Sequence, residues 1–236
     1  MSLDISRINQ NELTPDQYVK DDCSAIKTQI FIHHTSGGSS PKNVIYGWQN
    51  NPEKVATAFI IAGKPTSKDT HKDGEIFQAF GSKYWAYHLA FSKKTNKVPA
   101  KYHNFTYEQK IAKGSIAIEI ASWGILTKDN EGNFRTYVNT IVPKEEVVIL
   151  DKPFRGSIYY HYYSDSQLSS LKELLIYLCD KYNISKKFNA DMFDINLRAL
   201  DGVNGIYTHC SVRSDKSDNF PYSKLIKVLK EIELGV

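Results

Sequence analysis

The chain has 236 residues, of which 41% are hydrophobic and 24% are charged. This balance is typical of a globular protein and excludes collagen-like, disulfide-scaffold and fully disordered chains. The net charge of +4 is far below that of a nucleic-acid-binding tail and is compatible with an acidic polymer as partner. Arginine is scarce relative to lysine, so we expect no nucleic-acid partner.

Cysteine content and hydropathy exclude further classes. The three cysteines, Cys23, Cys179 and Cys210, form neither a disulfide framework nor a paired metal motif. No apolar run approaches the ~18 residues that span a bilayer, and the polar first residues lack the apolar core of a signal peptide. We therefore expect a protein that is cytoplasmic as synthesised and has no membrane span. The sequence carries no signal for an oligomeric state.

Residues 1–25 are polar and weakly periodic, so we predict an N-terminal arm that precedes one domain over residues 26–236. The first half of this domain contains β-branched and aromatic runs bounded by polar turns, which predict strands. Ser40 and Pro41 predict a helix start, because proline at the first helical position has no amide hydrogen to leave unpaired. The predicted elements here are a strand at 28–33, a helix from 40 to 50, a hairpin of strands 56–63 and 74–80, and a strand at 114–122.

The second half of the domain begins with residues 123–163, which contain strand-like pieces and turn signals and are predicted to be an insertion. Ser164 and Gln167 form a capping-box pattern, and leucines at helical spacing follow it. A strand at 205–210 and a closing helix around 225–232 complete the chain. Strands that alternate with helices predict an α/β fold: a single domain with a mixed central β-sheet, flanked by helices and carrying the strand-containing insertion.

Polar residues at strand positions are candidates for chemistry. His33 and His34 end the first predicted strand, and His209 ends the last one. Because adjacent strand residues point to opposite faces, at most one of the two neighbouring histidines faces a given site. Glu119 lies within the apolar strand SIAIEIAS, where an unpartnered carboxylate is costly to bury. It is either a structural or solvent-facing residue, or a general base or the partner of a bound ion.

The loop after His209 offers a third ligand to a metal ion. Asp218 is the candidate on this loop, with Asp215 as a rival and Cys210 as a less favourable one. Two histidines and one carboxylate with an open fourth position are a usual catalytic zinc set. The alternative is a surface loop with ordinary charges.

Five segments of the chain occur in an order that resembles one enzyme family: IFIHHTSGG, DGEIFQAFGSKYWAYHLAF, GSIAIEI, YSDSQLSSLKELLIYL and THCSVRSDKSDNFP. The family is that of the zinc N-acetylmuramoyl-L-alanine amidases, which includes phage lysozyme-amidases, muropeptide amidases and peptidoglycan recognition proteins. The resemblance covers residues 26–232, interrupted by the insertion.

The resemblance implies a site and an activity. The implied Zn²⁺ ligands are His33, His209 and Asp218; the implied catalytic residues are Glu119 as general base and Lys216 at the oxyanion; His88 is implied to contact substrate. The implied reaction is hydrolysis of the amide bond between the lactyl group of N-acetylmuramic acid and L-alanine, in peptidoglycan or muropeptides. The enzyme would act on the cell wall or its fragments, as a bacteriolytic phage endolysin or a bacterial recycling or remodelling enzyme.

The chain departs from the family pattern in its hairpin turn at 64–73 and its insertion at 123–163, which are longer than usual, and at two sets of site positions. Asn219, Phe220 and Pro221 stand where many members have Pro-Gly after the third ligand, and Thr57 lies near the position of a catalytic tyrosine found in some members. Two other functions remain as alternatives: a non-catalytic peptidoglycan-binding module, and a zinc peptidase that cuts the stem peptide.

Overall fold

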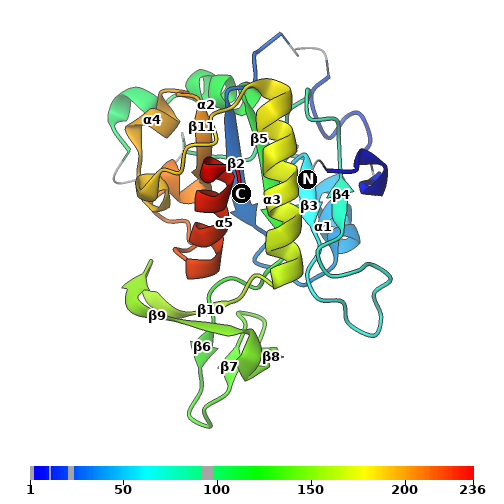
Figure 1. Cartoon of the computed structure of the whole chain (residues 1–236), viewed down its shortest axis with the longest axis vertical. Coiled ribbons are helices and arrows are strands. Elements are labelled where there is room, and N and C mark those ends of the chain that lie inside the picture. Colours follow the sequence, from blue (N-terminus) through cyan, green and yellow to red (C-terminus); the bar gives the residue numbers. More distant parts are fainter. Residues whose placement is uncertain (1–2, 11, 21–23, 92–97) are drawn as a thin grey trace.

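A six-stranded sheet forms the centre of the computed structural model, which describes residues 3–10, 12–20, 24–91 and 98–236 (Figure 1). The strands, in spatial order, are β1 (Asn9–Gln10), β4 (Ile76–Gln78), β3 (Phe59–Ile61), β5 (Ser115–Ile120), β2 (Gln29–His34) and β11 (Gly205–Thr208). Strand β4 runs antiparallel to β3, and all other neighbours pair in parallel. The predicted mixed sheet is confirmed.

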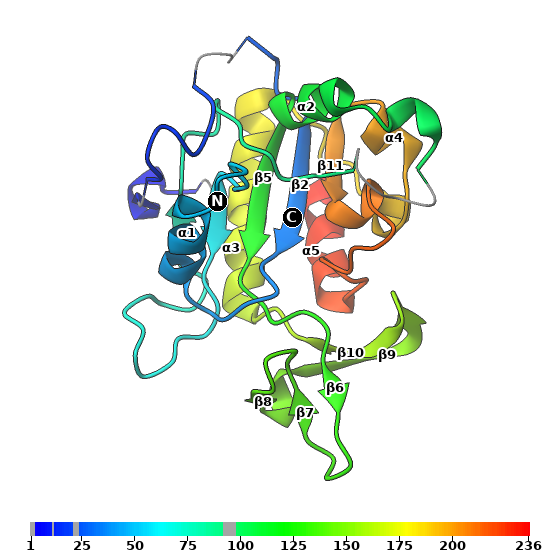
Figure 2. The ribbon, with the colours of Figure 1, turned by 180° about the vertical axis from the view of Figure 1, so that it is seen from behind.

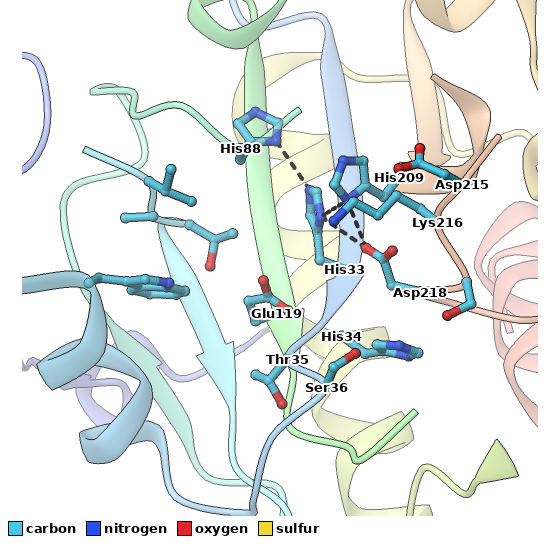
Figure 3. A pocket seen from close by; sticks show the side chains of 15 residues that line it. His33, His34, Thr35, Ser36, His88, Glu119, His209, Asp215, Lys216 and Asp218 are labelled. Atoms are coloured by element: carbon cyan, nitrogen blue, oxygen red, sulfur yellow. Dashed lines mark hydrogen bonds and ion pairs between the residues drawn. The ribbon is translucent and has the colours of Figure 1, made fainter. Parts of the chain in front are cut away.

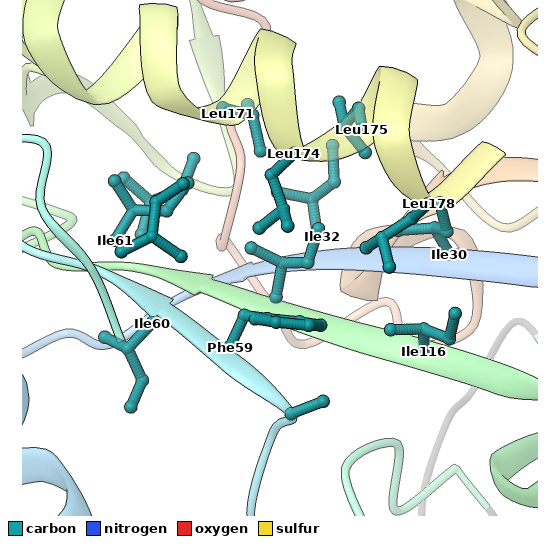
Figure 4. Packing of buried hydrophobic residues seen from close by; sticks show 14 of the residues in the cluster. Ile30, Ile32, Phe59, Ile60, Ile61, Ile116, Leu171, Leu174, Leu175 and Leu178 are labelled. Atoms are coloured by element: carbon teal, nitrogen blue, oxygen red, sulfur yellow. The ribbon is translucent and has the colours of Figure 1, made fainter. Parts of the chain in front are cut away.

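Helices α3 (Asp165–Tyr182) and α5 (Ser223–Leu234) cover one face of this sheet (Figure 1). Leucines of α3 point at isoleucines of the strands, including Ile30 and Ile116, whereas Ile60 points to the other side (Figure 4). Burying one such leucine stabilises the fold by about 1.5–3 kcal/mol. The helical spacing read from the sequence therefore corresponds to the face of α3 that closes the core.

The opposite face is covered by α2 (Phe105–Lys113) and α4 (Leu197–Leu200), for which the sequence analysis makes no prediction (Figure 2). Helix α1 (Pro41–Gln49) lies beside β3 and begins at the predicted proline. Because the sheet is covered on both faces, all six residues of β2 are buried, as is typical of parallel strands. The short 3₁₀ helices are η1 (Ile5–Arg7), η2 (Ala100–Tyr102), η3 (Lys144–Glu146), η4 (Ala190–Phe193) and η5 (His209–Ser211).

The predicted insertion is a separate β-structure at the end of the sheet to which β2 and β5 point (Figures 1 and 2). It contains a three-stranded sheet and a two-stranded ribbon. Their strands are β6 (Thr127–Lys128), β7 (Phe134–Arg135), β8 (Ile141–Val142), β9 (Val147–Phe154) and β10 (Ser157–His161). Tyr160 of β10 stacks on Phe220 with ring centroids 4.2 Å apart, so the insertion contacts the loop that follows β11.

The segment predicted as an arm packs on the domain in its described part. Leu3, Ile8, Leu13 and Tyr18 are buried in the main core, and β1 adds a strand to the sheet edge. Cys23 lies outside the described residues. The boundary between residues 25 and 26 stays a prediction. No helix among the described residues is both long and apolar enough to cross a membrane.

Candidate metal centre

The parallel register of β2 and β5 sets two candidate residues side by side. His33 is the partner of Glu119 across these strands, so both side chains project from the same face of the sheet. The neighbouring His34 points to the other face, where its Nδ1 lies 2.9 Å from the Tyr163 hydroxyl. Of the two adjacent histidines, only His33 reaches the cluster that follows.

Three ligand atoms converge at the carboxyl ends of β2 and β11 (Figure 3). The Nδ1 atoms of His33 and His209 are 3.1 Å apart. One oxygen of Asp218, Oδ2, lies 3.2 Å from the first and 2.9 Å from the second. A tetrahedral ion with bonds of ~2.0–2.1 Å has its ligands about 3.3 Å apart, so this donor set fits zinc.

The protonation states also suit a metal ion. Burial, reinforced by the nearby His209, lowers the pKa of His33 to about 4. Burial alone would raise the pKa of Asp218, but the two imidazoles outweigh it and hold that pKa well below its usual range. A neutral imidazole beside an ionised carboxylate is the combination that coordinates a divalent cation without first losing a proton.

The rival ligands have partners other than the two imidazoles, although Asp215 lines the same cavity. Asp215 is exposed and accepts a hydrogen bond from Arg213 Nε at 2.9 Å. The Cys210 thiol faces the backbone carbonyls of Lys216 and Asp218, at 3.1 and 3.3 Å, and burial raises its pKa to about 12. The structure thus brings Asp218, and neither rival, to the two imidazoles.

The residues after Asp218 explain how the loop turns without Pro-Gly. Asn219 has a φ of 57°, a left-handed conformation that asparagine tolerates better than most residues. Its side-chain amide lies 3.4 Å from the His33 carbonyl and 3.3 Å from the Tyr163 hydroxyl, and Phe220 is fully buried. These contacts fasten the loop to β2 and thereby hold the Asp218 carboxylate in place.

Glu119 lines the cavity beside the cluster, together with Lys216, Trp48 and Thr57. The cavity has a volume of about 400 Å³. Within the described residues, Oε2 of Glu119 is buried and has no hydrogen-bond partner. Burial, and next the charge of Asp218, raise its pKa well above the usual range. Such a carboxyl group is suited to take up and release a proton.

His88 was expected to contact substrate, and the structure gives it other partners. Its Nδ1 lies 3.1 Å from Nε2 of His33, and its Nε2 lies 2.9 Å from the Ser115 hydroxyl. His88 also lines the cavity that contains the cluster, so its contact with substrate stays a prediction. The sequence analysis missed Ser115 and the Leu89 carbonyl, which lies 2.8 Å from Nε2 of His209. Ser115 shares the strand face of Glu119, and this alternation was the signal that could have revealed it.

A second cavity, of about 580 Å³, lies between the sheet and the insertion. The linings of the two cavities include residues that are neighbours in sequence, because Ser36 lines the first cavity and Gly37 the second. Lys64, Trp123 and Glu146 are among its lining residues. The metal cluster therefore lies in the first cavity, and the second cavity has charged and aromatic lining residues of its own.

Residues 24–221 match the family model described as N-acetylmuramoyl-L-alanine amidase. Comparison with curated proteins finds no match. Among solved structures, the chain is similar to PlyL at 13% identity, with a TM-score of 0.49 over 97% of this chain and 98% of that one. It is similar to the PlyG catalytic domain at 14% identity, with a TM-score of 0.49 over 96% and 95%. It is similar to the N-acetylmuramoyl-L-alanine amidase LysC from Clostridium intestinale URNW at 15% identity, with a TM-score of 0.44 over 97% of this chain and 97% of that one. At these identities and TM-scores, the informative result is the family match.

Proposed function

Since the chain belongs to the N-acetylmuramoyl-L-alanine amidase family, we propose that it hydrolyses its substrate with zinc held by His33, His209 and Asp218. The enzyme cuts the amide bond between the lactyl group of N-acetylmuramic acid and L-alanine in peptidoglycan. The observation that carries the zinc proposal is the convergence of two Nδ1 atoms and one carboxylate oxygen within 3.2 Å of one another. When bound, zinc lowers the pKa of a water molecule toward ~7 and polarises a carbonyl.

Glu119 is the proposed general base. Its unpartnered oxygen lies in the same cavity as the cluster, where it can accept a proton from water as the water oxygen bonds to the lactyl carbonyl carbon. The same carboxyl group then gives that proton to the departing L-alanine nitrogen as the carbon–nitrogen bond breaks. A positioned acid–base group of this kind contributes ~10²–10⁴ to the rate.

Lys216 is proposed to stabilise the negative charge that develops on the carbonyl oxygen. It lines the cavity that contains Glu119 and the cluster, two positions before Asp218, and is half-buried. Fixed positive charge at such a position is worth ~10²–10³ in kcat. The arrangement requires no tyrosine at position 57, where Thr57 donates its hydroxyl hydrogen to the Phe59 carbonyl.

We further propose that the substrate is the polymeric cell wall, as for an endolysin. The second cavity, between the sheet and the insertion, supports this proposal because a polymer extends on either side of the cut bond and needs such room. A soluble muropeptide would leave that cavity partly unused.

The test is digestion of purified sacculi and of soluble muropeptides, with and without a zinc chelator, followed by mass spectrometry. We expect intact stem peptides with a free L-alanine amino group, faster release from sacculi, and loss of activity that added Zn²⁺ restores. Cleavage inside the stem peptide would identify a zinc peptidase. Binding to the wall without any released peptide would identify a binding module and contradict the proposal.

A further inference from the structure

Two consecutive residues, His88 and Leu89, contact the outer ring nitrogens of the two histidines in the metal centre. Figure 3 shows the contact between His88 and His33. Nε2 of His209 lies 2.8 Å from the Leu89 carbonyl oxygen. A carbonyl oxygen only accepts, so His209 carries its proton on Nε2 and presents the Nδ1 lone pair to the centre. To present its own Nδ1 lone pair, His33 must likewise carry its proton on Nε2. The partner of that nitrogen is the imidazole of His88, which can donate or accept a hydrogen bond.

The hydrogen bonds of Ser115 indicate which ring nitrogen of His88 carries the proton. The Ser115 hydroxyl donates to the Ala112 carbonyl at 3.2 Å and lies 2.9 Å from Nε2 of His88. A hydroxyl has one hydrogen. With that hydrogen on the Ala112 carbonyl, the hydroxyl oxygen is the acceptor for Nε2–H of His88. A neutral imidazole has only one N–H, which makes Nδ1 of His88 the acceptor for Nε2–H of His33. The Nδ1 atom of His33 is then left with its lone pair.

Burial of the three side chains, and contacts of Lys27 near Ser115, favour hydrogen bonding in the direction from His33 through His88 to Ser115. His33, His88 and Ser115 are 3%, 9% and 2% exposed, so water competes little for their hydrogen bonds. The backbone carbonyl of Ser115 accepts from the buried ammonium group of Lys27 at 2.9 Å. That ammonium group also donates to the carbonyl of Lys113 at 2.7 Å. The end of α2 and the start of β5 are therefore tied together where the hydroxyl is needed.

We propose that Ser115 and His88 form a one-way hydrogen-bond relay that holds His33 in its Nε2–H tautomer and so makes Nδ1 the metal-binding nitrogen. His88 is then a positioning residue. The relay rests on the proposed zinc site but is a separate statement about these side chains. A neutral imidazole as outer partner adds no negative charge, so Asp218 supplies the only ligand charge.

The first test measures Zn²⁺ affinity by competition with a chromophoric chelator. In Ser115→Ala, the Nε2–H of His88 loses its acceptor, and the preference for one tautomer of both rings is lost. We expect the zinc dissociation constant to rise about 10–100-fold, as is usual when an outer partner of a ligand is removed. His88→Asn keeps a side-chain oxygen that can accept from His33 and should bind zinc more tightly than His88→Leu.

Two buried residues outside the relay serve as controls. Ser82 is 5% exposed and its hydroxyl contacts the Tyr182 hydroxyl at 2.7 Å; His71 is 7% exposed and contacts the Gly63 carbonyl. Ser82→Ala and His71→Asn should perturb packing to a similar degree but leave zinc affinity at the wild-type value. Weakened binding in these controls equal to that in Ser115→Ala would mean a general loss of packing and would overturn the relay.

The second test needs no variant. Nitrogen NMR of the histidine rings in the zinc-loaded wild type should show both His33 and His88 protonated at Nε2, with Nδ1 of His88 bare. Protonation of His88 at Nδ1, or Ser115→Ala protein that binds Zn²⁺ as tightly as the wild type, overturns the relay. Wild-type protein that binds zinc but releases no peptide contradicts the proposed function instead, and the NMR result then still decides the relay.

Discussion

The pKa values of two carboxyl groups in one cavity are shifted in opposite directions because their neighbours differ: that of Asp218 is lowered and that of Glu119 is raised. Asp218 contacts two imidazoles, which outweigh its burial and keep it ionised. Oε2 of Glu119 is buried without a hydrogen-bond partner among the described residues. Burial, and next the charge of Asp218, raise the pKa of this carboxyl group. Separation of pKa values between neighbouring groups is how a site assigns one as ligand and the other as acid–base catalyst.

The choice of ligand predicts a contrast between two aspartates on one loop. Asp218→Asn keeps the shape of the side chain but removes the charge next to both imidazoles, so the purified protein should hold far less than about one zinc per chain. Asp215→Asn removes a carboxylate that pairs with Arg213 and is not among the clustered ligands, so this variant should keep its zinc. Metal analysis after dialysis measures both. Full zinc in the Asp218 variant would refute the proposed ligand set.

The general-base role predicts that Glu119→Gln lowers kcat ~10²–10⁴-fold and leaves the zinc content unchanged, because the side chain is not among the clustered ligands. Glu108→Gln, at another buried glutamate on α2, is the control and should retain activity. Rates of peptide release, normalised to bound zinc, measure the effect. Loss of zinc from the Glu119 variant would show that this carboxylate is a ligand or a structural residue.

At the scale of single elements, helix α3 begins at local hydrogen bonds whose residue pattern can be recognised in the sequence. The Ser164 hydroxyl accepts from the backbone amide of Gln167, and the Gln167 side chain accepts from the backbone amide of Ser164. This capping box starts α3 where the pattern predicted it. Gln167 also donates to the Ala121 carbonyl at 2.8 Å, so the first turn of the helix is joined to the end of β5.

The cap predicts a measurable loss of stability. Ser164→Ala removes the acceptor for the Gln167 amide and the hydrogen bond to Asp73, and should cost about 1–2 kcal/mol. For a chain of this length, each kcal/mol corresponds to about 2–4 °C in Tm. Ser169→Ala, at an exposed position within the same helix, should leave Tm unchanged or slightly higher. Equal melting temperatures for the two variants would remove the cap as a source of stability.

At the scale of the whole molecule, a charge cluster joins the insertion to the body. Glu146, at the insertion, accepts from Lys64 at 2.8 Å and lies 3.5 Å from Nε2 of His161. The hydrogen bond with His161 is the largest influence on Glu146 and, with Lys64, lowers its pKa to about 2 despite partial burial. All three residues of the cluster line the second cavity, so the cluster joins the insertion to the body at that cavity.

This lowered pKa predicts a pH dependence with a definite sign. The unfolded carboxyl group titrates near ~4.3, so the stabilisation by Glu146 is complete above that pH and is lost as pH falls toward 2. Because the group is partly solvated, we expect about 1 kcal/mol. Urea unfolding should show Glu146→Gln less stable than wild type at pH 7, with the gap closing in acid. Glu145→Gln, at an exposed neighbour, should show no gap; a gap for Glu146→Gln that is constant with pH would contradict the prediction.

The sequence by itself determined the elements whose signals are local. The β-branched runs of β2 and β5, the proline that begins α1 and the capping box of α3 each depend on residues a few positions apart. The family resemblance identified the enzyme class, which the family match confirms. It also predicted His33, His209 and Asp218 as the zinc ligands, because strand ends and loop motifs can be recognised in a sequence without knowing where the strands lie.

Only the tertiary structure decided which atoms meet. The parallel register sets His33 against Glu119, and the Asn219 turn brings Asp218 rather than Asp215 to the imidazoles. No local pattern encodes the contact of His88 with His33, because these residues lie on segments far apart in the chain. Contacts of this kind depend on the order and spacing of strands in the sheet, which arise when distant apolar faces are buried together.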